Sequence, residues 1–193
     1  MKNLERLFAE KLLKIKAIKL QPANPFTWAS GWKSPFYCDN RKTLSYPSLR
    51  NFVKIEITRL ILERFGQVDA IAGVATGAIP QGALVADALN LPFVYVRSTP
   101  KDHGLENLIE GELRPGMEAI RRDGCEVIGM VAAYTYGFPV AEEAFKNAKV
   151  TLVTLTNYEA VLDVALRTGY IEEEDIQTLN EWRKDPAHWD AGK

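Results

Sequence analysis

The hydrophobic pattern changes period several times along the chain, and each change predicts an element. Apolar residues such as Phe8 recur every three or four positions near the start, which predicts an amphipathic helix over residues 3–18. A second helix is predicted over residues 47–65, because Pro47 suits a first helical turn, where its missing N–H costs nothing. Residues 19–45 are instead rich in Pro, Gly, Ser and aromatic residues, so we expect a small irregular β subdomain, called the hood below.

From residue 68 onward, continuous apolar runs alternate with helical patterns. A strand that is apolar along its whole length is typical of a parallel sheet covered by helices on both faces. We therefore predict one α/β domain over residues 1–193, with a doubly wound, mostly parallel sheet. Strands are expected at 68–74, 92–96, 125–133 and 149–155, helices at 79–89, 139–147, 157–168 and 172–183, and a long polar loop at 98–112.

Composition narrows the class of protein. Hydrophobic residues make up 47% of the 193 residues and charged residues 25%, which are ordinary globular values. The net charge of −1 gives no reason to expect a nucleic-acid or membrane partner. Cys38 and Cys125 lie in separate apolar stretches, and we interpret them as reduced thiols of a cytoplasmic protein. The first residues are charged and lack the apolar run of a signal peptide.

The loop that follows the strand at 92–96 brings together Arg97, Lys101 and His103. Arginine fits phosphate oxygens with a planar fork, lysine adds a mobile point charge, and histidine can donate a proton near neutral pH. Such a loop suits a polyanionic leaving group such as pyrophosphate. An ordinary solvated, charged loop is the alternative that this segment leaves open.

A turn of small residues, Thr76, Gly77 and Ala78, joins the strand at 68–74 to the next helix. Small residues let backbone N–H groups approach an anion, and the dipole of the helix favours negative charge there. In an open α/β sheet, ligands bind at the carboxyl ends of the strands, where both this turn and Arg97 fall. The turn is therefore a candidate anion site, with a plain βα turn as the alternative.

Three segments, taken in order, resemble the orotate phosphoribosyltransferases, and the resemblance covers nearly the whole chain. Residues 30–41 read SGWKSPFYCDNR, close to the family's SGxxSPxYxDxR. Residues 73–80 look like the family's pyrophosphate-side loop, and Lys101-Asp102-His103-Gly104 looks like its mobile catalytic loop. The resemblance implies a fold like that of the type I phosphoribosyltransferases.

The resemblance also implies an activity. The members of the family are pentosyltransferases. They couple orotate to 5-phosphoribosyl 1-diphosphate (PRPP), giving orotidine 5′-monophosphate and pyrophosphate in the biosynthesis of UMP. The resemblance also implies that Mg²⁺ bridges the diphosphate, although no protein ligand to the metal is identified in this sequence. It further implies a homodimer with shared active sites. By this resemblance the catalytic residues are Lys101 and His103, the PRPP and pyrophosphate contacts add Arg97, Thr76, Gly77 and Ala78, and the orotate contacts are Phe36 and Tyr37. Phe36 and Tyr37 could instead be part of the core of the hood.

The chain departs from the family in one large respect. Gly116 runs straight into a helical fragment at 117–122, which is too short for a crossover helix of roughly ten residues or more. The family's signature for the ribose 5-phosphate, an apolar strand with acidic residues and a Thr-Gly-rich turn, would fall between Gly116 and Met117 and is absent. If this absence is a genuine deletion, the alternative is a non-catalytic binding or regulatory protein with the same fold.

Smaller departures concern lysines. Ala29, Gly77 and Ser98 stand where some family members have lysine, so the roles of those lysines do not transfer to this chain. A purine-type phosphoribosyltransferase is a further alternative, which the hood motif disfavours.

Overall fold

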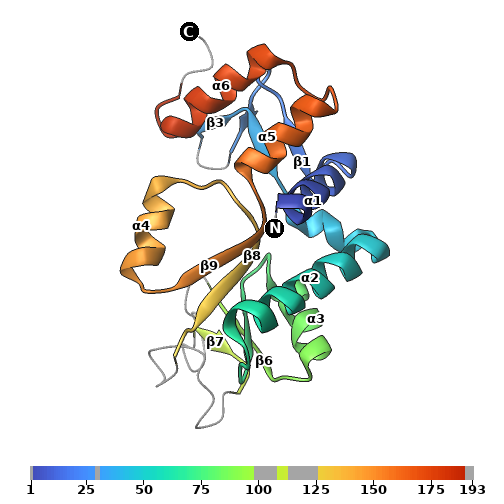
Figure 1. The fold of residues 1–193 in the computed structure, drawn as a ribbon. Helices are drawn as coiled ribbons and strands as arrows, with labels where there is room; N and C mark the ends of the chain where they lie inside the picture. The colour runs from blue at the N-terminus through green and yellow to red at the C-terminus, as the bar shows by residue number, and fades with distance from the viewer. Residues whose placement is uncertain (1, 29–30, 98–107, 113–125, 190–193) are drawn as a thin grey trace. The chain divides into compact units, whose positions relative to one another are not determined.

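The computed structural model describes residues 2–28, 31–97, 108–112 and 126–189. The chain divides into two compact units (Figure 1). The first unit comprises Met1–Thr43, Ala133–Glu142 and Thr154–Lys193, and the second comprises Leu44–Ala132 and Glu143–Val153. No helix in the described ranges is long and apolar enough to cross a membrane.

The first unit begins with α1 (Lys2–Lys14), which packs against α5 (Tyr158–Arg167). The helix ends earlier than the prediction of 3–18, because Lys16 takes a left-handed conformation with φ 54°. The amide of Ala17 then donates to the carbonyl of Leu12 at 2.9 Å, and the amide of Lys16 to that of Leu13 at 2.9 Å. This pair of bonds is the Schellman closure of a helix, so the chain turns directly into strand β1 (Ile18–Leu20).

The hood consists of two short antiparallel ladders. Strand β1 pairs with β4 (Phe36–Cys38), with Leu20 opposite Phe36, and β2 (Phe26–Thr27) pairs with β3 (Lys33–Ser34). The extended runs predicted around residues 26–28 and 36–38 are therefore strands. A 3-10 helix, η1 (Asn40–Ser45), follows β4.

An aromatic cluster forms the core of the first unit around α6 (Glu173–Lys184). The rings of Phe36 and Trp182 are completely buried and stacked, with their centroids 6.3 Å apart. The Tyr158 hydroxyl donates to the Leu179 carbonyl at 2.8 Å, which ties α5 to α6. Arg183 lies 4.8 Å from the centre of the Tyr158 ring, so a cation–π contact closes the cluster on one side. The predicted helix at 172–183 is thus held by ring packing.

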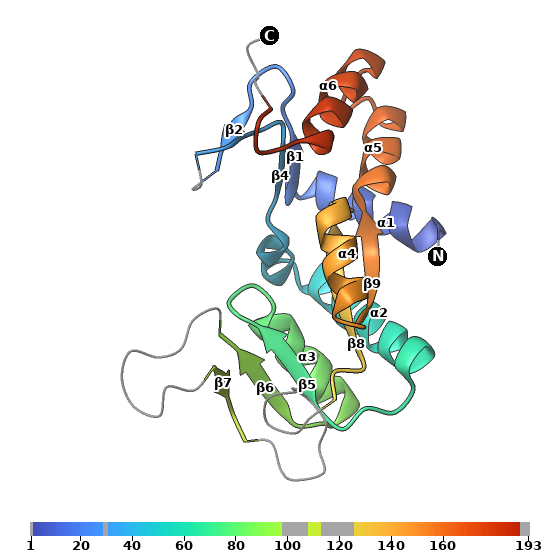
Figure 2. The same cartoon turned by 90° about the vertical axis from the view of Figure 1, so that its left-hand side faces the viewer.

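The second unit contains α2 (Pro47–Phe65), β5 (Ile71–Val74), α3 (Ile79–Leu89), β6 (Phe93–Val96) and β7 (Ile109–Glu110). Strands β5 and β6 are parallel, and α3 packs on both, as the alternating pattern predicts (Figure 2). Strand β7 lies inside the segment predicted to be a polar loop, and it pairs antiparallel with β6. A strand of two residues is too short to show an alternating hydrophobic pattern, so the sequence did not predict it.

Strands β8 (Gly129–Thr135) and β9 (Thr151–Asn157) pair with each other, with α4 (Pro139–Asn147) between them in the sequence. Within the described ranges, the strands outside the hood form two ladders, β5–β6–β7 and β8–β9, where the sequence predicts one sheet. Every residue of β8 is partly exposed, although its apolar sequence predicts a strand buried on both faces. The α/β class is confirmed, whereas β8 lacks the full cover that its sequence suits.

Candidate functional site

The turn at residues 75–78, called the anion turn below, lies at the carboxyl end of β5 and opens α3. The amide of Ala75 donates to Val96 at 2.7 Å and that of Ala78 to Val74 at 3.1 Å, which fixes the turn to the strand ends. Thr76, Gly77 and Ala78 are exposed. Within the described residues, no acceptor contacts the amides of Thr76 and Gly77. Two N–H donors and the positive end of a helix dipole are thus exposed at this turn, and binding of an anion there stays a prediction.

Gly73 makes the fold of the anion turn possible. A Cβ atom at Gly73 would lie 3.0 Å from Cζ of Phe93 and 3.1 Å from the Ala78 carbonyl oxygen, closer than packed atoms normally approach. A Cβ atom at Gly77 would meet nothing within 4 Å. The close approach of strand and turn therefore requires glycine at position 73, whereas Gly77 contributes an exposed amide that no side chain crowds.

Arg97 follows β6, and the structure gives it a partner that the sequence analysis missed. Its Nη1 lies 3.5 Å from Oε1 of Glu110 on β7, and its backbone amide donates to Leu108 at 2.8 Å. The Arg97 side chain is 34% exposed, so a ligand can still reach it. Any anion bound there would share the guanidinium with Glu110, because the carboxylate already compensates part of its charge.

Two residues of the predicted catalytic loop, Lys101 and His103, lie outside the described residues. Their predicted contacts with the leaving group stay predictions.

On the hood, the structure separates the two residues predicted to contact orotate. Phe36 is 0% exposed, and its ring stacks on Tyr134 with the centroids 5.5 Å apart. This burial matches the alternative that Phe36 belongs to the core of the hood. Tyr37 is half-buried, on the opposite face of β4, and its ring centroid lies 5.5 Å from that of Phe26. Tyr37 is thus the residue of the pair with a face open to a ligand.

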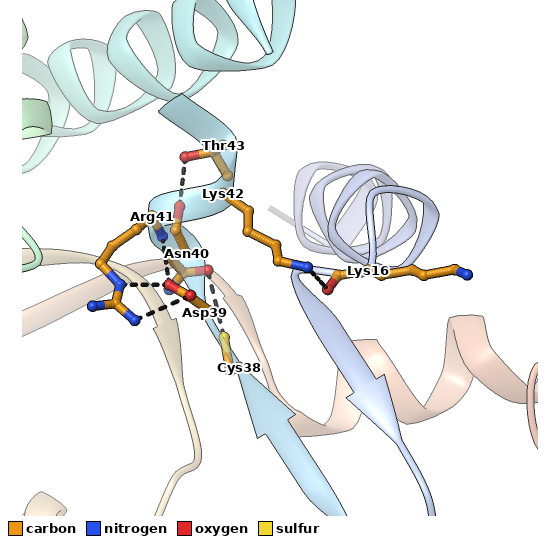
Figure 3. A network of polar contacts seen from close by, with 7 residues as sticks. All are labelled: Lys16, Cys38, Asp39, Asn40, Arg41, Lys42 and Thr43. Atoms are coloured by element: carbon orange, nitrogen blue, oxygen red, sulfur yellow. Dashed lines mark hydrogen bonds and ion pairs between the residues drawn. The ribbon is translucent and has the colours of Figure 1, made fainter. Parts of the chain in front are cut away.

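Directly after β4, Asp39 holds Arg41 with a bidentate contact (Figure 3). Arg41 donates from Nε to Oδ1 at 2.7 Å and from Nη2 to Oδ2 at 3.1 Å, and its backbone amide donates to Oδ1 at 3.2 Å. The side-chain hydrogen bond from Arg41 lowers the pKa of Asp39, and the same bond raises the pKa of Arg41. Neither side chain is among the residues predicted from the sequence to contact a substrate.

The rest of this segment is structural. Burial raises the pKa of the Cys38 thiol to about 12, so the thiol stays protonated, and it donates to Oδ1 of Asn40 at 3.5 Å. Lys42 donates to the carbonyl of Lys16 at 3.1 Å, which satisfies a carbonyl just beyond the end of α1 (Figure 3). These contacts fix the direction in which the chain leaves β4 and so the position of Arg41.

The described residues do not form a Mg²⁺ site of their own. No group of three or more His, Cys, Asp or Glu side chains among them could hold a metal ion. The anion turn offers N–H donors, which bind oxyanions and not cations. Magnesium commonly takes substrate phosphates and water as most of its ligands, so a metal carried by a diphosphate needs no protein cage.

Comparison with known proteins gives close relatives, although no family model matches the chain. The orotate phosphoribosyltransferase of Bacteroides thetaiotaomicron is 90% identical over 212 residues, covering 100% of both chains. That of Porphyromonas gingivalis is 62% identical over 208 residues, covering 98% of this chain and 99% of the relative. Among solved structures, the orotate phosphoribosyltransferase of Aeropyrum pernix has a TM-score of 0.64 at 26% identity, covering 85% of this chain and 99% of that one.

A likeness in fold alone extends further. The UMP synthase of Leishmania donovani has a TM-score of 0.74 at 20% identity, covering 93% of this chain and 42% of that one.

The alignment with the Bacteroides thetaiotaomicron relative also measures the predicted absence. It runs over 212 positions and includes the whole of both chains, whereas this chain has 193 residues, so 19 positions have no residue here. Identity of 90% over 212 positions means that almost all of the 193 residues are the same in the two proteins. A shortfall of this size fits the strand, loop and half-helix that the sequence analysis finds missing.

The full-length matches agree with the hood motif and with the anion turn at the end of β5. On this basis the chain belongs to the orotate phosphoribosyltransferase family, and its fold is that of the type I phosphoribosyltransferases.

Proposed function

We propose that the reaction for which this chain is built is the transfer of the phosphoribosyl group from PRPP to orotate, giving orotidine 5′-monophosphate and pyrophosphate in the biosynthesis of UMP. Full turnover requires the segment that is absent after Gly116. The observation that carries the proposal is the 90% identity, over the whole of both chains, to a protein named orotate phosphoribosyltransferase. The two parts of the candidate site support it separately, since one offers donors for an anion and the other an aromatic surface beside a cation.

The anion turn and Arg97 would bind the diphosphate. In the reaction, the bond from the anomeric carbon to the diphosphate oxygen breaks and its electron pair leaves with pyrophosphate. The orotate ring nitrogen forms the new bond to carbon and gives up its proton to solvent. Positive charge develops on the sugar and negative charge on the leaving group, so donors aimed at the leaving group lower the barrier. The exposed amides of Thr76 and Gly77 and the guanidinium of Arg97 are such donors.

Lys101 and His103 complete the proposal on the leaving-group side. A lysine supplies a second positive charge, and a histidine can give a proton to the departing pyrophosphate. Exclusion of water by the loop would protect the activated sugar from hydrolysis.

On the pyrimidine side, Tyr37 would lie against the flat ring of orotate, whereas Phe36 would act by holding β4 against the aromatic core. Mg²⁺ would arrive with the diphosphate and neutralise part of its charge. A homodimer in the cytoplasm is part of the same proposal, by likeness to the family.

The proposal is tested by titrating the chain with orotate and, separately, with hypoxanthine in a calorimeter. We expect saturable binding of orotate and none of hypoxanthine, because the hood motif is that of pyrimidine-specific members. Binding of hypoxanthine without orotate would contradict the assignment.

The ion pair between Arg97 and Glu110 gives a further prediction. Glu110→Gln should raise the affinity of the chain for pyrophosphate by about two- to fivefold, since it removes the carboxylate that competes for Arg97. The control is Glu112→Gln, which alters an exposed carboxylate nearby. Isothermal titration with pyrophosphate measures both, and equal affinities in the two variants would show that Glu110 does not compete with the anion for Arg97.

A further inference from the structure

We infer that Arg41 recognises the carboxylate group of orotate, with its guanidinium held in place by Asp39. The inference rests on the proposed function and deepens it, because it names the residue that distinguishes orotate from a pyrimidine without a carboxylate. The comparisons with known proteins assign no role to Arg41.

The contact with Asp39 leaves part of the guanidinium open. Asp39 accepts from Nε and Nη2, and the guanidinium has more N–H donors than these two bonds use. Within the described residues, no acceptor contacts Nη1. The Arg41 side chain is 64% exposed, so the edge that carries Nη1 faces solvent. An edge of this kind binds a carboxylate through two parallel hydrogen bonds.

Asp39 also removes much of the freedom that an exposed arginine normally has. The bidentate contact and the bond from the Arg41 amide fix both the fork and the base of the side chain (Figure 3). A donor fixed before its ligand arrives loses less entropy on binding than a mobile one. This arrangement is therefore better suited to recognition than that of an unrestrained surface arginine.

Tyr37 lies beside the guanidinium. It stands two residues before Asp39, so the two side chains lie on the same face of the chain leaving β4. Tyr37 is among the groups that raise the pKa of Arg41, after the larger effect of Asp39. A half-buried aromatic ring and a fixed cation are thus adjacent, and orotate is a flat ring that carries a carboxylate.

Three other cations in the hood fit the carboxylate less well. One of them, Lys42, already donates to the carbonyl of Lys16 at 3.1 Å. Lys33 donates to the Thr27 hydroxyl at 2.9 Å and is already engaged. Lys19 stands opposite Tyr37 in the β1–β4 ladder and is the rival for the role. A lysine is a mobile point charge without a planar fork, so it cannot make the paired contact that Arg41 offers.

The test compares orotate with uracil, which has the same ring and no carboxylate, by calorimetric titration of the full chain. Orotate should bind the parent chain at least about tenfold more tightly than uracil. Arg41→Ala should lose that preference by weakening orotate alone, Arg41→Lys should keep part of it, and the control Lys33→Ala should keep all of it. Thermal unfolding of each variant verifies that it is folded. If Arg41→Ala does not fold, Arg41→Gln replaces it in the test.

The outcomes separate the inference from the proposed function. If the parent chain binds orotate and Arg41→Ala retains the full preference over uracil, the inference is wrong and the proposed function stands. If Lys19→Ala removes the preference for orotate and Arg41→Ala does not, Lys19 binds the carboxylate of orotate and the inference is again wrong. If the parent chain does not bind orotate at all, the proposed function falls and the inference falls with it.

Discussion

Insertion of the 19 residues that the Bacteroides thetaiotaomicron relative has in addition should raise the rate of orotidine 5′-monophosphate formation by at least about 10³-fold. The predicted site of insertion is between Gly116 and Met117, where the family's signature for the ribose 5-phosphate is absent. Without the N–H groups of that turn, PRPP cannot be held by its 5-phosphate, so the anomeric carbon is not positioned for attack.

The measurement is a titration with PRPP together with a rate assay, on the 193-residue chain and on the chain with the segment inserted. The control is an insertion of the same length made of Gly and Ser, which should not restore PRPP binding. Tight PRPP binding, or full activity in a chain whose mass is confirmed at 21.6 kDa, would contradict the view that an essential segment is missing.

The same insertion should stabilise the fold. Every residue of β8 is partly exposed, and the described strands outside the hood form two ladders where the sequence predicts one sheet. Unpaired strand edges favour aggregation, so the shorter chain should also be less soluble. A higher melting temperature and less aggregation after insertion of the native segment, and not of the Gly-Ser segment, are the expected results.

The second large effect concerns the catalytic loop. In the chain with the segment inserted, Lys101→Ala and His103→Ala should each lower turnover by on the order of 10²-fold or more, because each removes a donor to the leaving group. Melting temperatures should barely change, as expected for residues in an exposed loop.

Lys146→Ala is the matched control for this pair, since Lys146 is an exposed lysine in the last turn of α4. It should change neither turnover nor stability. A large loss of melting temperature with normal turnover in Lys101→Ala or His103→Ala would show that these residues are structural.

The elements that the sequence predicts well are those with strong local signals. Helices α2, α3 and α4 begin and end at the predicted residues. Pro47 marks the start of α2, and α4 has a clear apolar periodicity. The predicted end of α1 is wrong because Lys16, and not a glycine, takes the left-handed position that closes the helix. Strand β7 was not predicted because only two residues form it.

The candidate site also has parts that local sequence signals predict and parts that they do not. The anion turn could be predicted, because its small residues stand directly between a strand and a helix. The burial of Phe36 could be given only as an alternative, since the rings that cover it come from Tyr134 and Trp182, far away in the sequence. Glu110 and Arg41 were missed for a related reason, because the importance of each depends on a contact that only the folded chain makes.

The most direct test of the account is the consumption of substrate by the chain with the 19-residue segment inserted. Formation of orotidine 5′-monophosphate is followed with orotate, with adenine and with hypoxanthine, each in the presence or absence of PRPP and of Mg²⁺. We predict product only from orotate, and only when both PRPP and Mg²⁺ are present. Turnover of adenine or hypoxanthine with no use of orotate would contradict the central claim.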